Sequence, residues 1–199
     1  PAEYKFNIAK KHDFSVLLGQ ESMTSKTVAF GANADGITDN RLSLMSAGAT
    51  ATVPSHSISE EVRNSWFGML NYSYADRYFL DLSIRRDGSS LFGENNRWAT
   101  FGAAAAMWNI TKENFMNSTR NWLNDLQFKV SYGSTGNSGI SPYMALGLVA
   151  AGPLYNGQSG TAIANASNPD LTREPVMTFT LALTGKVLNR VTFDLEYYD

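Results

Sequence analysis

The sequence predicts an all-β fold, in which antiparallel up-and-down strands form part of a transmembrane β-barrel. Three observations support this prediction. Apolar and polar side chains alternate with a period of two, short and long connections alternate along the chain, and tryptophans stand at both ends of one strand. These features correspond to the two faces of a barrel wall, its two edges, and its boundaries with the lipid headgroups.

Composition agrees with a β-rich envelope protein. The chain has 199 residues, of which 43% are hydrophobic, 12% are aromatic and only 17% are charged, against about 25% charged residues in a typical soluble domain. A net charge of −2 gives no basic field for nucleic acid, and the lack of cysteine excludes disulfides and thiolate-bound metals. No run reaches the roughly 18 apolar residues of a membrane-spanning helix, whereas a barrel strand needs only about 10 alternating residues.

About eight segments follow the period-two pattern. In one of them Tyr78, Leu80 and Leu82 alternate with Asp81 and Ser83. Successive side chains of a strand point to opposite faces, so each such segment reads as a half-buried strand. The segments are 3–9, 12–21, 62–74, 78–86, 98–108, 126–132, 178–184 and 191–198.

The connections between these segments differ in length in a regular way. Short links join the first and second segments, the third and fourth, and the last two. Long polar links cover 22–60, 87–96 and 134–173, and the link 110–124 is intermediate. In outer-membrane barrels short turns face the periplasm and long loops face outside, so this alternation predicts which edge is which.

The aromatic positions predict the height of the wall. Trp98 and Trp108 are ten residues apart, which is about 33 Å of strand, or roughly 25 Å along the membrane normal after tilting. That height matches the apolar band between two aromatic girdles. A soluble antiparallel β-sandwich that binds glycans would show the same alternation of side chains, so it stays open as the alternative.

Several motifs resemble the barrel of SusC/RagA-like TonB-dependent outer-membrane transporters. They are Arg-Arg-Asp-Gly-Ser-Ser at 85–90, Asn-Arg-Trp at 96–98, Ile-Thr-Lys-Glu-Asn-Phe-Met at 110–116, Tyr-Gly-Ser-Thr-Gly-Asn at 132–137 and Asn-Pro-Asp-Leu at 168–171. Their order and spacing carry the resemblance over 74–199, while 1–63 rests on the alternating pattern alone. Two departures are Arg173, where the family usually has an aromatic residue, and Gly102-Ala103, where it usually has Pro and Ser.

The resemblance implies a partial barrel domain over 1–199 of a larger, 22-stranded barrel. The chain begins at Pro1 and ends inside a predicted strand, so we expect a piece of a longer protein whose plug domain and TonB box lie elsewhere. The resemblance also implies the outer membrane of a Gram-negative bacterium, contact with its lipid, a TonB complex, and a SusD-like surface lipoprotein. The expected activity is energy-coupled uptake of oligosaccharides or peptides without a cofactor.

Candidate site residues fall into two groups. The long loop carries residue types that often contact sugars or peptides, because an aromatic ring offers a flat apolar face with a polar tip; an ordinary mobile loop is the alternative. The candidates are Tyr143, Tyr155, Asn156 and Gln158. Polar residues of the strands are expected to face the lumen, namely Asp81, Arg85, Gln127, Lys129, Asp194 and Glu196.

The sequence offers no catalytic or metal-binding constellation. His12 and His56 have no neighbour at a metal-ligand spacing. Asp87-Gly88 is a preferred turn pair rather than the start of a calcium loop. Asp194 and Glu196 could act as a glycosidase pair only within a suitable cleft, and we expect them to face the lumen instead. The sequence therefore predicts a transporter segment, not an enzyme.

Overall fold

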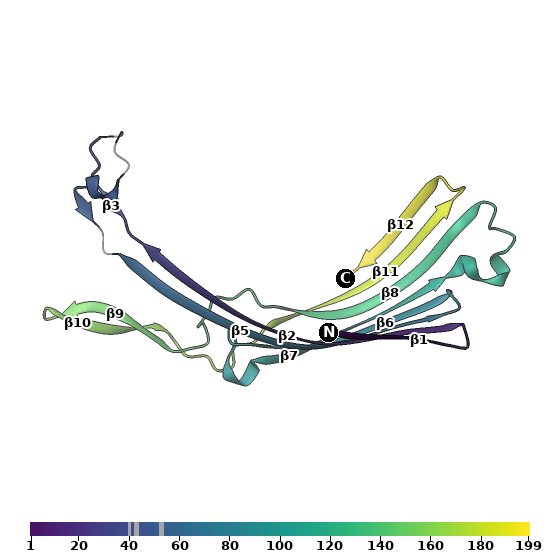
Figure 1. Ribbon diagram of the computed structural model, residues 1–199, viewed down its shortest axis with the longest axis horizontal. Coiled ribbons are helices and arrows are strands. Elements are labelled where there is room, and N and C mark those ends of the chain that lie inside the picture. The colour runs from purple at the N-terminus through teal and green to yellow at the C-terminus, as the bar shows by residue number, and fades with distance from the viewer. Residues whose placement is uncertain (40, 42–43, 52–53) are drawn as a thin grey trace.

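A computed structural model describes residues 1–39, 41, 44–51 and 54–199, without the side chains of residues 154, 155 and 159. The chain forms one curved antiparallel sheet of eight strands, in the order β1-β2-β5-β6-β7-β8-β11-β12 (Figure 1). This confirms the all-β prediction and its number of strands. The strands are β1 (Ala2–Ile8), β2 (His12–Gly31), β5 (Ser55–Tyr74), β6 (Tyr78–Ser89), β7 (Trp98–Asn109), β8 (Leu123–Asn137), β11 (Glu174–Val187) and β12 (Val191–Tyr198).

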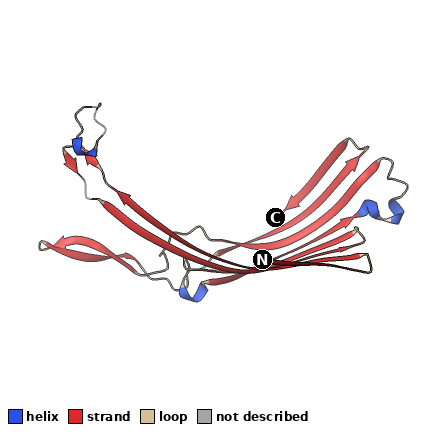
Figure 2. Ribbon diagram, viewed as in Figure 1, coloured by secondary structure: helices blue, strands red, loops and turns tan. Residues whose placement is uncertain are grey.

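The remaining elements are small and lie outside the main sheet (Figure 2). Two hairpins form separate two-stranded sheets, and four single-turn 3₁₀ helices stand in the connections. They are β3 (Ala34–Asp35) with β4 (Thr50–Ala51), β9 (Leu148–Tyr155) with β10 (Gln158–Asn165), and η1 (Met45–Ala47), η2 (Glu94–Asn96), η3 (Ile110–Lys112) and η4 (Asn114–Met116). No helix in the described part of the chain is long and apolar enough to cross a membrane.

The predicted connection 22–60 is too long. β2 continues to Gly31, β5 begins at Ser55, and the two pair in unbroken register from His12 opposite Tyr74 to Gly31 opposite Ser55. Most side chains of this outer extension are exposed on both faces. Pairing between the two backbones therefore holds the extension, and no buried face imposes a strong alternation on its sequence.

The predicted connection 134–173 contains the β9–β10 hairpin, which the alternation of side chains does not predict. Its turn is Asn156-Gly157, and both residues have positive φ, as a type I′ turn requires. The Asn-Gly pair was a usable hairpin signal, but the flanking strands are rich in alanine and glycine and alternate weakly.

Three connections of three residues each stand at one edge of the sheet, here called the short-turn edge; the opposite edge is the long-loop edge. Ala75 and Asp76 have φ of 51° and 55°, and the same left-handed pairs recur at 9–10 and 188–189. The Arg77 amide donates to the Tyr74 carbonyl at 2.9 Å and closes the middle turn. Type I′ turns twist in the same sense as the strands that they join, so they keep the wall in register.

Apolar burial is almost absent from the wall itself. Most side chains of the strands are exposed or half-buried, and Ile84 on β6 is 60% exposed. Tyr78 and Leu82 are 45% and 39% exposed, and no second sheet covers them in the part of the chain that the structure describes. A β-sandwich would bury these side chains between two layers, so that alternative is wrong.

Candidate functional site

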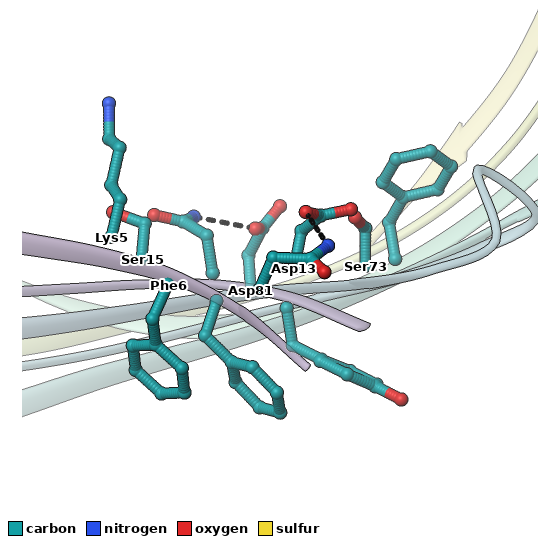
Figure 3. A pocket seen from close by; sticks show the side chains of 11 residues that line it. Lys5, Phe6, Asp13, Ser15, Ser73 and Asp81 are labelled. Atoms are coloured by element: carbon teal, nitrogen blue, oxygen red, sulfur yellow. Dashed lines mark hydrogen bonds between the residues drawn. The ribbon is translucent and has the colours of Figure 1, made fainter. Parts of the chain in front are cut away.

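The register of the strands places the polar side chains of the wall on one face. Lys5, Ser15, Asn71 and Asp81 occupy directly opposed positions on β1, β2, β5 and β6. Figure 3 shows Lys5, Ser15 and Asp81 on one side of the ribbon and Phe6 on the other. The polar side is the one toward which the sheet curves (Figure 1), and we call it the concave face.

All six residues predicted to face the lumen belong to the concave face. Asp81 and Arg85 lie on the same face of β6, and the cross-strand partners continue this face onto β8, β11 and β12. On these strands Lys129 stands opposite Ala182, which stands opposite Glu196. Likewise Gln127 stands opposite Thr184, which stands opposite Asp194. That this face lines a lumen stays a prediction.

Hydrogen bonds hold several of these side chains across neighbouring strands. The Asn71 amide donates to Asp81 at 2.6 Å, and the Thr184 hydroxyl donates to Asp194 at 3.1 Å. Arg85 donates to Asp87 at 2.6 Å and to Glu21 at 3.0 Å. These four carboxylates therefore have partners within the sheet. The described residues contain no group of three His, Asp or Glu side chains that could hold a metal ion.

Small and hydroxyl side chains leave a shallow trough along the middle of the concave face. It has a volume of about 290 Å³ and extends from β5 across β6, β7 and β8 to β11. Its floor includes Ala103, Ala105, Ser131, Gly133, Thr178 and Thr180. Ala103 on β7 stands directly opposite Gly133 on β8, so neither strand has a large side chain at this point of the face. The alternation of side chains predicts the polarity of this face but not its shape.

A continuous belt of aromatic side chains follows the short-turn edge on the opposite, convex face. The rings of Phe6 and Phe14 stack with centroids 4.8 Å apart, and Phe14 meets Tyr72 at 4.8 Å. Farther along the sheet, Tyr74 meets Tyr78 at 6.3 Å and Tyr78 meets Trp108 at 6.5 Å. Contacts at these distances are typical of paired aromatic rings.

His12 lies within this belt. Its ring centroid is 4.7 Å from that of Tyr74, and its Nδ1 hydrogen-bonds the Tyr72 hydroxyl at 2.9 Å. At the other end of the strands, the Arg86 guanidinium lies 5.6 Å from the Trp98 ring centre. Trp98 and Trp108 thus mark the two ends of the convex face of β7, and apolar side chains of the neighbouring strands lie between them.

The connection 110–122 anchors the belt to the short-turn edge through one carboxylate. Glu113 accepts hydrogen bonds from the Tyr78 hydroxyl at 2.6 Å and from Trp108 Nε1 at 3.2 Å, and it pairs with Arg77 at 3.3 Å. The pKa of the Glu113 carboxyl lies below its ordinary value of 4.5, mainly because the carboxylate accepts the hydrogen bond from Tyr78. The hydrogen bond from Trp108 and the positive charge of Arg77 lower the pKa further.

At the long-loop edge, two of the sequence motifs meet. We call residues 90–97 and 168–173 together the outer-loop cluster. The Gly93 amide donates to the Leu171 carbonyl at 2.9 Å, and the Asn95 side chain donates to Asp170 at 2.7 Å. Leu91 and Phe92 are each 2% exposed, so the cluster contains two of the four buried apolar side chains of the described residues, and the two most deeply buried.

The four predicted ligand-contact residues do not form one group. Tyr143 lies before β9, has a φ of 67°, and accepts a hydrogen bond from the Glu60 amide through its hydroxyl at 2.8 Å. Asn156 and Gln158 are exposed at the far end of the β9–β10 hairpin. The side chain of Tyr155 lies outside the described residues. Ligand contact at these positions stays a prediction.

The whole chain matches a known family. Residues 2–199 match the model of the TonB dependent receptor-like β-barrel. The chain belongs to this family. TonB-dependent receptors are outer-membrane proteins of Gram-negative bacteria and are transporters rather than enzymes, so the predictions of localisation and of a non-enzymatic role are confirmed.

Individual relatives support the SusC/RagA-like assignment. TonB-dependent receptor P26 of Formosa agariphila is 34% identical over 98% of this chain, and TonB-dependent receptor SusC of Bacteroides thetaiotaomicron is 36% identical over 67% of it. Solved structures of the RagAB peptide transporter superpose on 98% of the chain with a TM-score of 0.86 at 36% identity. The chain spans about a fifth of the length of these proteins, namely 20%, 14% and 22%.

Proposed function

We propose that this chain forms part of the barrel wall of an energy-coupled outer-membrane importer. The observation that carries the proposal is the difference between the two faces of a single curved sheet. The convex face is apolar and carries an aromatic belt, as a lipid-facing surface does, and the concave face carries the polar side chains. The trough of small residues would leave room along the lumen for cargo or for a plug domain.

The proposed cargo is a peptide, with oligosaccharides as the second candidate. The RagAB structures, which superpose on nearly the whole chain, are those of a peptide transporter. A SusD-like lipoprotein at the long-loop edge and a TonB complex on the periplasmic side belong to the same proposal, because the SusC/RagA-like barrel and its motifs support it. The plug domain and TonB box would then lie in another part of the receptor.

Uptake by intact cells tests this proposal. Cells that carry the full receptor should accumulate a labelled oligopeptide, and cells with the receptor gene deleted should not. Deletion of the TonB box should abolish uptake while leaving surface binding in place. Uptake of a neutral oligosaccharide but not of peptides would overturn the choice of cargo, and uptake that is independent of the TonB box would overturn energy coupling.

A further inference from the structure

Three arginines meet at the outer end of the concave face. Arg63 on β5, Arg85 on β6 and Arg173, next to the start of β11, line one pocket of about 100 Å³. Ser65 and Asp87 of the concave face complete its wall on this side. The pocket therefore opens at the mouth of the proposed lumen, between the wall and the outer-loop cluster.

Two of the three guanidinium groups already have carboxylate partners. Arg85 pairs with Asp87 at 2.6 Å and with Glu21 at 3.0 Å, and it also donates to Ser65 at 3.0 Å. Arg63 pairs with Glu61. These two residues set the positive edge of the pocket, but much of their charge is balanced locally.

Arg173 is different. It is only 6% exposed, and its guanidinium lies 4.2 Å from the ring centre of Phe92. Its single hydrogen bond to the described residues goes to the Arg97 carbonyl at 3.3 Å, and none of their carboxylates lies within ion-pair distance of it. Burial, together with the nearby charge of Arg63, lowers the pKa of the Arg173 guanidinium, and Asp87 opposes this effect.

Arg173 lines the pocket and has hydrogen-bond donors that the described residues leave unused. A guanidinium has five N–H donors in a fixed fork, and only one is used here. Among the described residues, no fully enclosed side-chain nitrogen or oxygen lacks a partner, so the remaining nitrogens of Arg173 have access to a surface. Arg173 is one of the residues that line this pocket, beside Arg63 and Arg85.

A glycine keeps the pocket open. A Cβ atom at Gly136 would stand 2.4 Å from the ring of Phe101 and 3.3 Å from Cδ of Arg173. Phe101 and Gly136 both line the pocket. A side chain at 136 would therefore force the Phe101 ring to shift and would crowd Arg173, so the pocket in its present form depends on glycine at this position.

We propose that this pocket binds the carboxylate of a cargo peptide, with the guanidinium fork of Arg173 as its main anchor. A planar fork matches a carboxylate with two parallel hydrogen bonds, and in a water-poor pocket such charge-assisted bonds are strong. The volume corresponds to about three water molecules, which admits one carboxylate and little more. The inference rests on the proposed function, because it specifies which part of a peptide the importer recognises.

Paired peptides test this inference in the full receptor, purified in detergent with its lipoprotein partner if one copurifies. The probe is a labelled pentapeptide with neutral side chains, used with either a free C-terminal carboxylate or a C-terminal amide. We expect the carboxylate form to bind wild-type receptor more tightly. Arg173→Gln should weaken binding of that form about 10- to 100-fold and leave the amide form unchanged. Arg173→Lys should restore part of the difference.

Two further variants keep the result interpretable. Arg63→Gln removes a positive charge from the pocket but leaves Arg173 stacked on Phe92. It should therefore weaken binding of the carboxylate peptide, and it gives a test even if Arg173→Gln fails to fold. Arg190 is an exposed arginine at the short-turn edge. Arg190→Gln is therefore the matched control and should leave the binding of both peptides unchanged.

The possible outcomes separate the two proposals. Equal binding of both peptides to every folded variant would overturn the carboxylate site while leaving peptide import intact. Failure of both peptides to bind wild-type receptor would overturn the proposed cargo and the site with it. Displacement of the carboxylate peptide by an oligogalacturonate at lower concentration than by unlabelled peptide would assign the pocket to acidic glycans and overturn the peptide assignment.

Discussion

The wall and the outer-loop cluster are stabilised in different ways. The wall buries almost no apolar side chain, and Ile84 and Leu195 on its convex face are 60% and 64% exposed. The outer-loop cluster buries Leu91 and Phe92 almost completely. The cluster therefore has a small conventional core that excludes water, whereas the wall depends on a hydrocarbon solvent around it and on the pairing of its backbones.

The largest expected effect tests the core of the cluster. Phe92→Ala should cost about 3–5 kcal/mol of local stability, because it leaves a cavity and removes the surface on which Arg173 stacks. Hydrogen exchange of residues 88–97 and 168–172 in the detergent-solubilised receptor measures this. Phe30→Ala is the control, since Phe30 is 72% exposed on the outer extension of β2. Equal protection in both variants would show that the cluster has no core of its own.

The second prediction tests the dependence of the wall on lipid. Leu82→Lys, on the convex face, should cost about 2–4 kcal/mol if the site lies near the midplane of the membrane. Ser83→Lys, the next residue along β6 but on the concave face, should change stability by only about 0.5 kcal/mol. The two variants are compared by their yield of folding into lipid bilayers, which is measured from the difference in gel mobility between heated and unheated samples. If both variants assemble equally well, the two faces are not distinguished by lipid.

The third prediction concerns how closely the two loops of the cluster approach. A Cβ atom at Gly93 would stand 2.0 Å from the Pro169 carbonyl oxygen and 2.8 Å from the Leu171 amide nitrogen, and both of these are backbone atoms. Gly93→Ala should therefore cost about 1–3 kcal/mol through forced backbone shifts. Gly102→Ala on the wall is the control, because its nearest contact would be an ordinary 3.4 Å. Hydrogen exchange at the two loops, measured as the temperature is raised, should show earlier loss of protection in Gly93→Ala than in Gly102→Ala.

The smallest effect is expected at the short-turn edge. The lowered pKa of Glu113 means that its stabilising contribution is present above pH 4.5 and is lost as the pH falls through the lower folded-state pKa. Residues 109–117 of the wild type should therefore lose hydrogen-exchange protection, corrected for intrinsic rates, between pH 7 and pH 3. Glu113→Gln should show the same protection at both pH values. A wild type that is insensitive to pH would contradict this role.

The sequence predicted the wall better than the loops for a physical reason. Every wall strand has one face that must be apolar, so Tyr78, Leu80 and Leu82 reveal their face directly. The outer extensions of β2 and β5 have no such constraint, and their pairing could not be read from alternation. The motif residues of the outer-loop cluster were recognised separately, but their contact joins positions about 75 residues apart along the chain.

The candidate site shows the same limit. Period two placed Asp81, Arg85 and Lys129 on one polar face, because the register transmits the face from strand to strand. The pocket of Arg173 could not be predicted in this way. Arg173 belongs to a loop, and only the fold brings it beside Arg63 and Gly136. Its departure from the residue usual in the family was visible, but nothing in the sequence showed that it was buried.

The turns of the short-turn edge limit where foreign sequence can be inserted. The turn at 75–76 has two residues in the left-handed region, and the Ala75 amide donates to the Lys11 carbonyl of the neighbouring turn at 2.7 Å. One added residue there would shift the register of a strand and reverse its faces. The Asn156-Gly157 tip of the β9–β10 hairpin belongs to a separate two-stranded sheet, so an epitope tag placed at that tip would label living cells without disturbing the wall.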